Sequence, residues 1–151
     1  MVGPVAAGKT TLANRLGPLF GLPVRELDDS YWRRGRLPDE AEWAAIHREI
    51  VQQERWIIAG DYRAVASERF RAADVVLWLD LPRRTCVVRA TLRKLGGNPA
   101  PLLDAWRWIV RYRSHGRVET VQALADPDLT CTILRVRRSG DVRAFLSALG
   151  A

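Results

Sequence analysis

Short apolar runs alternate along this chain with longer segments in which apolar residues recur at helical spacing. The apolar runs predict strands at about 23–27, 56–60, 72–81 and 129–136. The helical periodicity predicts helices at about 10–19, 38–54, 82–95, 102–114, 118–125 and 141–149. The run AADVVLWLDL at 72–81 is almost continuously apolar, as in a central strand covered on both faces. This alternation predicts one α/β domain over residues 1–151, a parallel sheet between two layers of helices.

Residues 3–10 read GPVAAGKT and match the phosphate-binding loop pattern G-x-x-x-x-G-K-[ST]. In such a loop, backbone N–H groups surround the phosphates, the lysine reaches the outer phosphates, and the hydroxyl residue binds Mg²⁺. The helix that follows points its positive end at the anion. We therefore predict ATP and Mg²⁺ as cofactors, with Thr10 as the metal ligand. The predicted nucleotide-binding residues are Gly3, Ala6, Ala7, Gly8, Lys9, Thr10 and Thr11.

Only Met1 and Val2 precede the loop, where a strand of about 5–6 residues is usual. The first strand of the sheet is therefore predicted to be truncated. If that strand is central, a chain beginning at Met1 is expected to leave unpaired backbone groups in its core and to be poorly stable. A start site further upstream is the favoured expectation. A signal peptide does not fit before a loop at residue 3, so we expect a cytoplasmic protein.

The charge of the chain is concentrated in one segment. The net charge is +7, but residues 83–117 hold nine Arg or Lys and one acid, which gives this segment +8. A basic block of this kind favours a polyanion nearby, either nucleotide phosphates or a nucleic acid backbone; the alternative is a solvated arginine-rich face. No apolar run approaches the roughly 20 residues that span a membrane. Cys86 and Cys131 lack metal-site spacing and are predicted to be free buried thiols.

Taken together, the motifs GPVAAGKTT, ELDDSYW, WIIAGDY and ADVVLWLDLPRRTCVVR, followed by an Arg- and Trp-rich helix, resemble the adenylate-kinase-like P-loop NTPases. The closer resemblance is to the bacterial DNA topology modulation proteins. It extends over nearly the whole chain and implies a three-layer fold. The implied sheet is parallel and has about five strands, with the loop strand in the middle. The resemblance also implies ATP·Mg binding and a kinase-like site with a small-molecule phosphate acceptor.

The resemblance assigns roles to several charged residues. Lys9 would hold the β- and γ-phosphates, and Asp28, after the second strand, is the candidate base; alternatively, Asp28 and Asp29 cap a turn. Related sequences carry an acid on the third strand, where this chain has Ala59. Either Asp61 or Asp80 is a possible substitute for it.

Three arginines complete the candidate catalytic set. Arg63 lies where related enzymes grip acceptor phosphate, and Arg89 and Arg93 share one helix face, from which related enzymes close on the phosphoryl group. The predicted lid-like helical segment is 96–117, with its glycine and proline residues as hinge.

The same segment allows a second hypothesis. Arg107 and Arg111 share a face beside Trp108 and Tyr112, which suits stacking and phosphate contacts on nucleic acid. Alternatively, residues 106, 109 and 110 simply pack the helix. The sequence thus favours an ATP-dependent kinase for a nucleotide, nucleoside or similar acceptor. The alternatives are a nucleotide-binding, DNA-associated regulatory protein without robust kinase activity, and a truncated, catalytically inactive relative.

Overall fold

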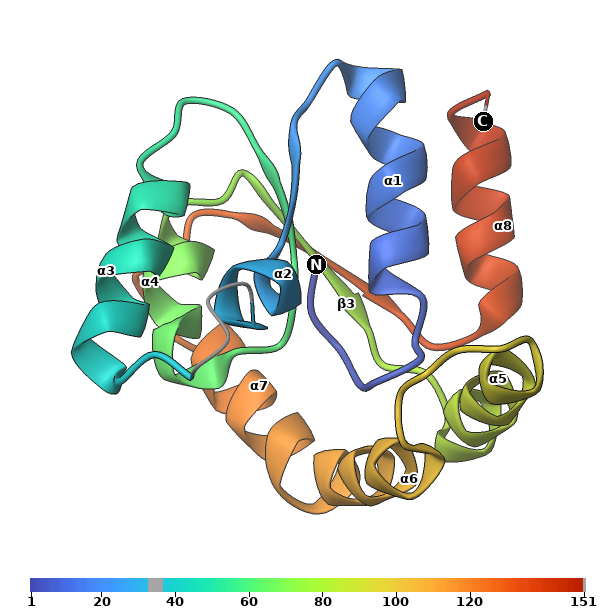
Figure 1. Ribbon diagram of the computed structural model, residues 1–151. Coiled ribbons are helices and arrows are strands. Elements are labelled where there is room, and N and C mark those ends of the chain that lie inside the picture. Colours follow the sequence, from blue (N-terminus) through green and yellow to red (C-terminus); the bar gives the residue numbers. More distant parts are fainter. Residues whose placement is uncertain (33–36, 151) are drawn as a thin grey trace.

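The computed structural model describes residues 1–32 and 37–150, except for the side chains of Trp32 and Arg63 (Figure 1). The described part contains four strands, which form two parallel pairs. The first pair is β1 (Val24–Glu26) with β2 (Ile57–Ala59), and the second is β3 (Val75–Leu79) with β4 (Thr132–Val136). The sheet therefore differs from the predicted five strands, because the segment before the phosphate loop makes only a single β-bridge, between Val2 and Trp78.

That N-terminal segment nevertheless occupies the centre of the sheet. On one side, the Met1 amino group donates to the Ile58 carbonyl at 2.5 Å, and the Gly60 N–H donates to the Met1 carbonyl at 3.2 Å. On the other side, the Val2 N–H donates to the Leu77 carbonyl at 3.0 Å, and the Leu79 N–H donates to the Val2 carbonyl at 2.9 Å. These bonds confirm that the segment before the loop lies in the middle of the sheet, since Met1 and Val2 join β2 to β3.

The helices agree with the periodicity except in three places. Their bounds are α1 Lys9–Phe20, α2 Leu27–Trp32, α3 Glu40–Val51, η1 Arg63–Val65, α4 Ala66–Arg71, α5 Arg83–Leu95, α6 Leu102–Arg111, η2 Tyr112–Gly116, α7 Arg117–Leu124 and α8 Ser139–Ala148. Asp28 and Asp29 lie in the first turn of α2, and residues 66–71 form α4; the periodicity predicted neither helix. The predicted break after residue 114 is instead the wide π turn η2, which connects α6 to α7 without interruption.

Alternate side chains of β3 enter different cores, as predicted for a strand covered on both faces. Leu77 and Leu79 pack with the cluster that includes α1, α5 and α8, whereas Val76 and Trp78 pack with α4 and residues of α7. Figure 1 shows α1 and α8 on one side of the sheet and α3 and α4 on the other. This arrangement is the predicted three-layer α/β architecture. Only Val75, at the start of the strand, is 48% exposed.

Two expectations from composition can be compared with the structure. Within the described ranges, no helix is long and apolar enough to cross a bilayer. Cys86 and Cys131 are free thiols. Cys86 is buried as predicted, but Cys131 is only partly buried.

Candidate active site

The phosphate loop has the backbone conformation that its glycines allow. Gly3 has φ +140° and Gly8 φ +96°, both in the region that favours glycine. A Cβ on Gly3 would lie 2.5 Å from the Leu79 carbonyl oxygen, so no larger residue fits there. Gly8 is the N-cap of α1, and no described side chain caps that helix end. The first N–H groups of α1 are therefore available to an anion, as the predicted phosphate site requires.

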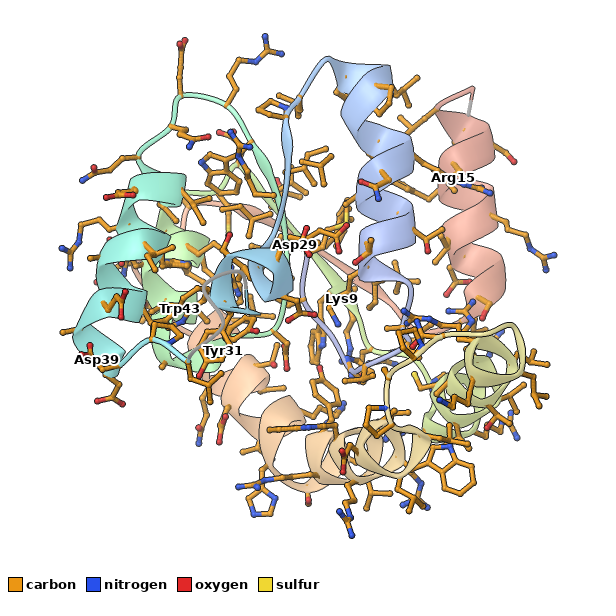
Figure 2. The ribbon with its side chains drawn as sticks, viewed as in Figure 1. Lys9, Arg15, Asp29, Tyr31, Asp39 and Trp43 are labelled. Atoms are coloured by element: carbon orange, nitrogen blue, oxygen red, sulfur yellow. The ribbon has the colours of Figure 1, made fainter. Side chains whose placement is uncertain are left out.

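Lys9 lies at the centre of the site (Figure 2). Its Nζ donates to the Gly3 carbonyl at 2.8 Å and to the Pro4 carbonyl at 2.9 Å, so the side chain folds back over the loop. Burial lowers the pKa of Lys9 below its ordinary value, and the carboxylates of Asp61 and Asp28 oppose this effect. Both acids are thus close enough to act on the ammonium charge. The structure brings the candidate base and the loop lysine into one site.

Thr10 reveals an acid that the sequence analysis missed. Its hydroxyl donates to Glu26 Oε2 at 2.8 Å, and Glu26 is the last residue of β1. A hydroxyl and a carboxylate oxygen together are ligands of the kind that Mg²⁺ prefers. These two residues therefore fit a metal ion at the start of α1. The signal was present in the sequence, since Glu26 precedes Asp28 by two residues, but the strand was predicted to continue to residue 27.

Asp28 is exposed at the start of α2, and its carboxylate is oriented by a phenol. The Tyr62 hydroxyl donates to Asp28 Oδ1 at 2.9 Å. The Tyr62 ring contacts Tyr31 and Trp43, with ring centroids 4.8 and 4.7 Å apart. The base candidate is accordingly held beside a small aromatic cluster. Asp29, the next residue of α2, is also exposed.

The two proposed substitutes for the missing acid have different surroundings. Ala59 is buried at the end of β2. Asp61 accepts a hydrogen bond of 3.4 Å from the Gly3 N–H, which places its carboxylate against the loop. Asp80 is instead surrounded by guanidinium groups: Arg117 Nε lies 3.1 Å from Oδ2, Arg135 Nη2 bonds the same oxygen, and Arg113 Nη1 lies 3.7 Å from Oδ1. Asp61 is therefore the better-placed substitute, and Asp80 is engaged in an ionic cluster.

The predicted arginines are only partly brought together. Arg89 Nη1 donates to the Ala7 carbonyl at 2.8 Å, and Nη2 donates to Ser139 Oγ at 3.1 Å. Arg89 therefore connects the phosphate loop to the start of α8. Arg93 is exposed one turn further along α5, and its charge lowers the pKa of Lys9. Both belong to α5, outside the 96–117 segment. The side chain of Arg63 lies outside the described part.

The aromatic residues of the 96–117 segment divide between core and surface. Tyr112 is buried, and its hydroxyl accepts a hydrogen bond of 2.9 Å from Trp78 Nε1, so it is not available for base stacking. Ile109 is buried as the core alternative required, but Trp106 and Val110 are 37% and 50% exposed. Trp108 is also exposed, with the Arg111 guanidinium 6.0 Å from its ring centroid.

Comparison with solved structures defines the fold. A shikimate kinase from Acinetobacter baumannii, solved in complex with shikimate, aligns with a TM-score of 0.66 at 16% identity, over 98% of this chain and 89% of that chain. A shikimate kinase from Bacteroides thetaiotaomicron aligns with a TM-score of 0.61 at 17% identity, over 98% and 92% of the two chains. This chain shares the α/β fold of these two shikimate kinases. An uncharacterized protein from Eubacterium ventriosum aligns with a TM-score of 0.55 at 10% identity, over 98% and 94%.

The comparisons at sequence level give no further assignment. No model of a known protein family matches the chain. No curated protein sequence matches it either. The resemblance to DNA topology modulation proteins consequently stays a prediction. The structural likeness establishes the fold alone, and the chemistry must be argued from the site itself.

Proposed function

We propose that this protein is an ATP-dependent kinase that phosphorylates a small hydroxylated molecule. The observation that supports this most directly is the convergence of Lys9, Asp28 and Asp61 at the phosphate loop. Phosphoryl transfer needs charge neutralisation and in-line positioning more than covalent help from the protein. A cation, an uncapped helix end and a candidate base within one site provide those elements.

Each residue then has a defined task. Lys9 and the N–H groups of residues 8–11 would hold the β- and γ-phosphates, while Thr10 and Glu26 would hold Mg²⁺. Bound ATP·Mg supplies the phosphoryl group and neutralises its charge. Asp28 accepts the proton of the acceptor hydroxyl, and Tyr62 fixes the Asp28 carboxylate for that task.

The acceptor is proposed to be a small polar molecule that enters beside α2. The Asp28 carboxylate and the aromatic cluster around Tyr62 lie there. The shikimate kinase from A. baumannii was solved with shikimate, a hydroxylated acid, so such acids belong in an acceptor panel together with nucleosides and nucleotides.

The decisive experiment is ATP turnover over that panel, together with ATP binding by calorimetry, for wild type and for Lys9→Ala. Removing the charge that faces the outer phosphates should abolish turnover and weaken ATP binding by at least about tenfold. Lys94→Ala is the matched control, because Lys94 is the only other lysine and its ammonium group donates to the Asn98 and Pro99 carbonyls at the surface. ATP binding by Lys9→Ala as tight as that of wild type contradicts the proposal.

Binding without turnover would instead support the inactive-relative hypothesis. The variant Ala59→Asp tests this directly, since it restores an acid at the end of β2 where related sequences carry one. A gain of turnover in that variant would assign the lost activity to Ala59.

A DNA-associated role is a second candidate, favoured by one surface. Trp106, Arg107, Val110 and Arg111 line an open groove on α6, within the +8 segment. We expect DNA affinity, if this role holds, to fall steeply with salt, and to fall less steeply in an Arg107→Gln, Arg111→Gln double variant. Absence of DNA retardation at low salt would exclude this role.

A further inference from the structure

Arg69 is a buried cation with incomplete hydrogen bonding. It lies on α4 and is 2% exposed. Its Nη2 donates to the Gly60 carbonyl at 3.4 Å, and its guanidinium lies 5.6 Å from the centroid of the Phe70 ring. Its Nε and Nη1 have no hydrogen-bond partner among the described residues. Buried donors of this kind are costly unless they are satisfied, so these two nitrogens require an acceptor.

A cavity of about 310 Å³, lined in part by Arg69, lies between α4, α7 and Val2. Val2, Phe70 and three alanines form its apolar wall. Its polar lining consists of Asp61, Ser67, Arg69, Glu119, Thr120 and Gln122. The cavity is large compared with the roughly 30 Å³ of one water molecule. It can therefore hold a small organic molecule as well as solvent.

The lining defines the chemistry of that molecule. Burial lowers the pKa of Arg69 to about 10, and the nearby Asp61 opposes this shift, so the guanidinium stays charged at neutral pH. A guanidinium pairs best with a carboxylate or phosphate oxygen. Asp61 and Glu119 line the same cavity and accept hydrogen bonds. A ligand whose carboxylate or phosphate group pairs with Arg69 can also place hydroxyl groups against the polar side chains of this lining.

We propose that this cavity is a second ligand site, for a small hydroxylated molecule whose carboxylate or phosphate group binds Arg69. The site does not use Lys9 or Asp28, and it does not depend on kinase activity. Asp61 connects the cavity to the phosphate loop, because it lines the cavity and accepts a hydrogen bond from the Gly3 N–H. A ligand in the cavity would therefore lie next to a residue that contacts the proposed nucleotide site.

The test follows the Arg69 Nε–H resonance of the full-length protein by NMR while glycerate or inorganic phosphate is added. We expect this resonance to shift with at least one probe, and the stronger probe identifies the preferred oxyanion. The shift should persist in Lys9→Ala, which separates the cavity from phosphate binding at the loop. No shift with either probe means that water alone satisfies Arg69, and this outcome overturns the proposal.

Two variants and one control make the test specific. Arg69→Gln lacks the Arg69 resonance, so its probe binding is measured by calorimetry beside wild type; it should be weaker by about tenfold or more, because a charged pair is lost. Arg71→Gln is the control, since Arg71 lies on the same helix but is exposed and pairs with Asp126. Ala123→Leu fills the cavity without altering Arg69 and should abolish the Nε shift. An undiminished shift in Ala123→Leu places the probe elsewhere and contradicts the proposal.

Discussion

Unsatisfied polar atoms gather in one part of the molecule, between α3 and α4. Trp43 Nε1, both ring nitrogens of His47, and two nitrogens of Arg69 are buried without a hydrogen-bond partner in the described part of the chain. His47 is completely buried, and its Nδ1 lies 3.7 Å from a Glu68 carboxylate oxygen. Burying polar side chains without hydrogen-bond partners lowers the free energy of unfolding, by an amount that changes with pH and with substitution of these residues.

The pH dependence of stability should report His47. Burial, with a smaller effect from Arg69, lowers the pKa of His47 from 6.5 to about 4. The unfolded chain therefore binds a proton near pH 6.5 that the folded chain accepts only near pH 4, so the contribution of His47 is present above pH 6.5 and is lost between these values. We expect a loss of about 2–3 kcal/mol from the free energy of unfolding between pH 7 and pH 4. Urea titrations of wild type and His47→Leu at both pH values measure this loss.

The control is His115→Gln, because His115 is exposed and bonds only the neighbouring Ser114 in the described structure. This variant should retain the wild-type pH dependence. Parallel stability curves for wild type and His47→Leu would show that the histidine does not titrate as proposed.

Gly3 should be intolerant of any side chain. Its positive φ and the close Leu79 carbonyl oxygen mean that Gly3→Ala strains the backbone and creates a clash. We expect a loss of about 2–4 kcal/mol in the free energy of unfolding, measured by chemical denaturation. Gly140→Ala is the contrasting variant, since a Cβ added there in α8 would meet no described atom within 4 Å, and it should gain about 0.5–1 kcal/mol. Equal stabilities of the two variants would contradict this account.

At the scale of elements, the Asp80 carboxylate connects η2 and α7 to the sheet. Asp80 follows β3, Arg135 lies on β4, and Arg113 and Arg117 lie in η2 and α7. The guanidinium groups of Arg135 and Arg117 also lie 4.3 and 5.7 Å from the centroid of the Trp78 ring. The C-terminal part of the predicted lid is therefore anchored to the core, which limits any closing motion to residues nearer the glycine and proline turn.

Asp80→Asn should release this anchor. The substitution leaves several guanidinium groups around an uncharged amide in a site where the side chain is 3% exposed. We expect a loss of about 3–5 kcal/mol in stability and faster amide hydrogen exchange in η2 and α7. Asp104→Asn is the control, because Asp104 is exposed and pairs only with Arg107 at 3.3 Å in the described structure. Unchanged exchange in α7 would mean that apolar packing alone holds the segment.

At the scale of the whole molecule, the first residues of the chain connect the β1–β2 pair to the β3–β4 pair by backbone hydrogen bonds. Met1 bonds β2, Val2 bonds β3, and Gly3 continues into the phosphate loop. The same short segment thus closes the sheet and positions the nucleotide site. Folding of the two halves and formation of the site should be coupled.

Val2→Pro tests this coupling, because proline cannot donate the hydrogen bond to the Leu77 carbonyl. We expect a loss of about 2–4 kcal/mol in stability and weaker ATP binding, measured by urea unfolding and calorimetry. Val2→Ala keeps the N–H and removes only side-chain packing, so it should be less damaging to nucleotide binding. Wild-type ATP affinity in Val2→Pro would show that the loop forms independently of the bridge.

The sequence by itself determined the layers of the fold and the phosphate loop. Periodicity identified the strands and most helices, since burial of one helix face or both strand faces leaves a local pattern. The loop motif identified Lys9 and Thr10, since its spacing is a property of a continuous backbone. In the structure Gly3 has the positive φ that favours glycine, and Lys9 and Thr10 lie in the first turn of α1.

Only the tertiary structure decided which distant charges meet. Glu26 joins Thr10 because β1 ends beside α1, and Asp80 joins Arg113, Arg117 and Arg135 because α7 and β4 converge on β3. Such pairs leave no periodic signal in sequence, because they depend on where separate elements end in space. For the same reason, the buried donors of Arg69 and the cavity that Arg69 lines in part became visible only once α4 and α7 were placed against the first residues of the chain.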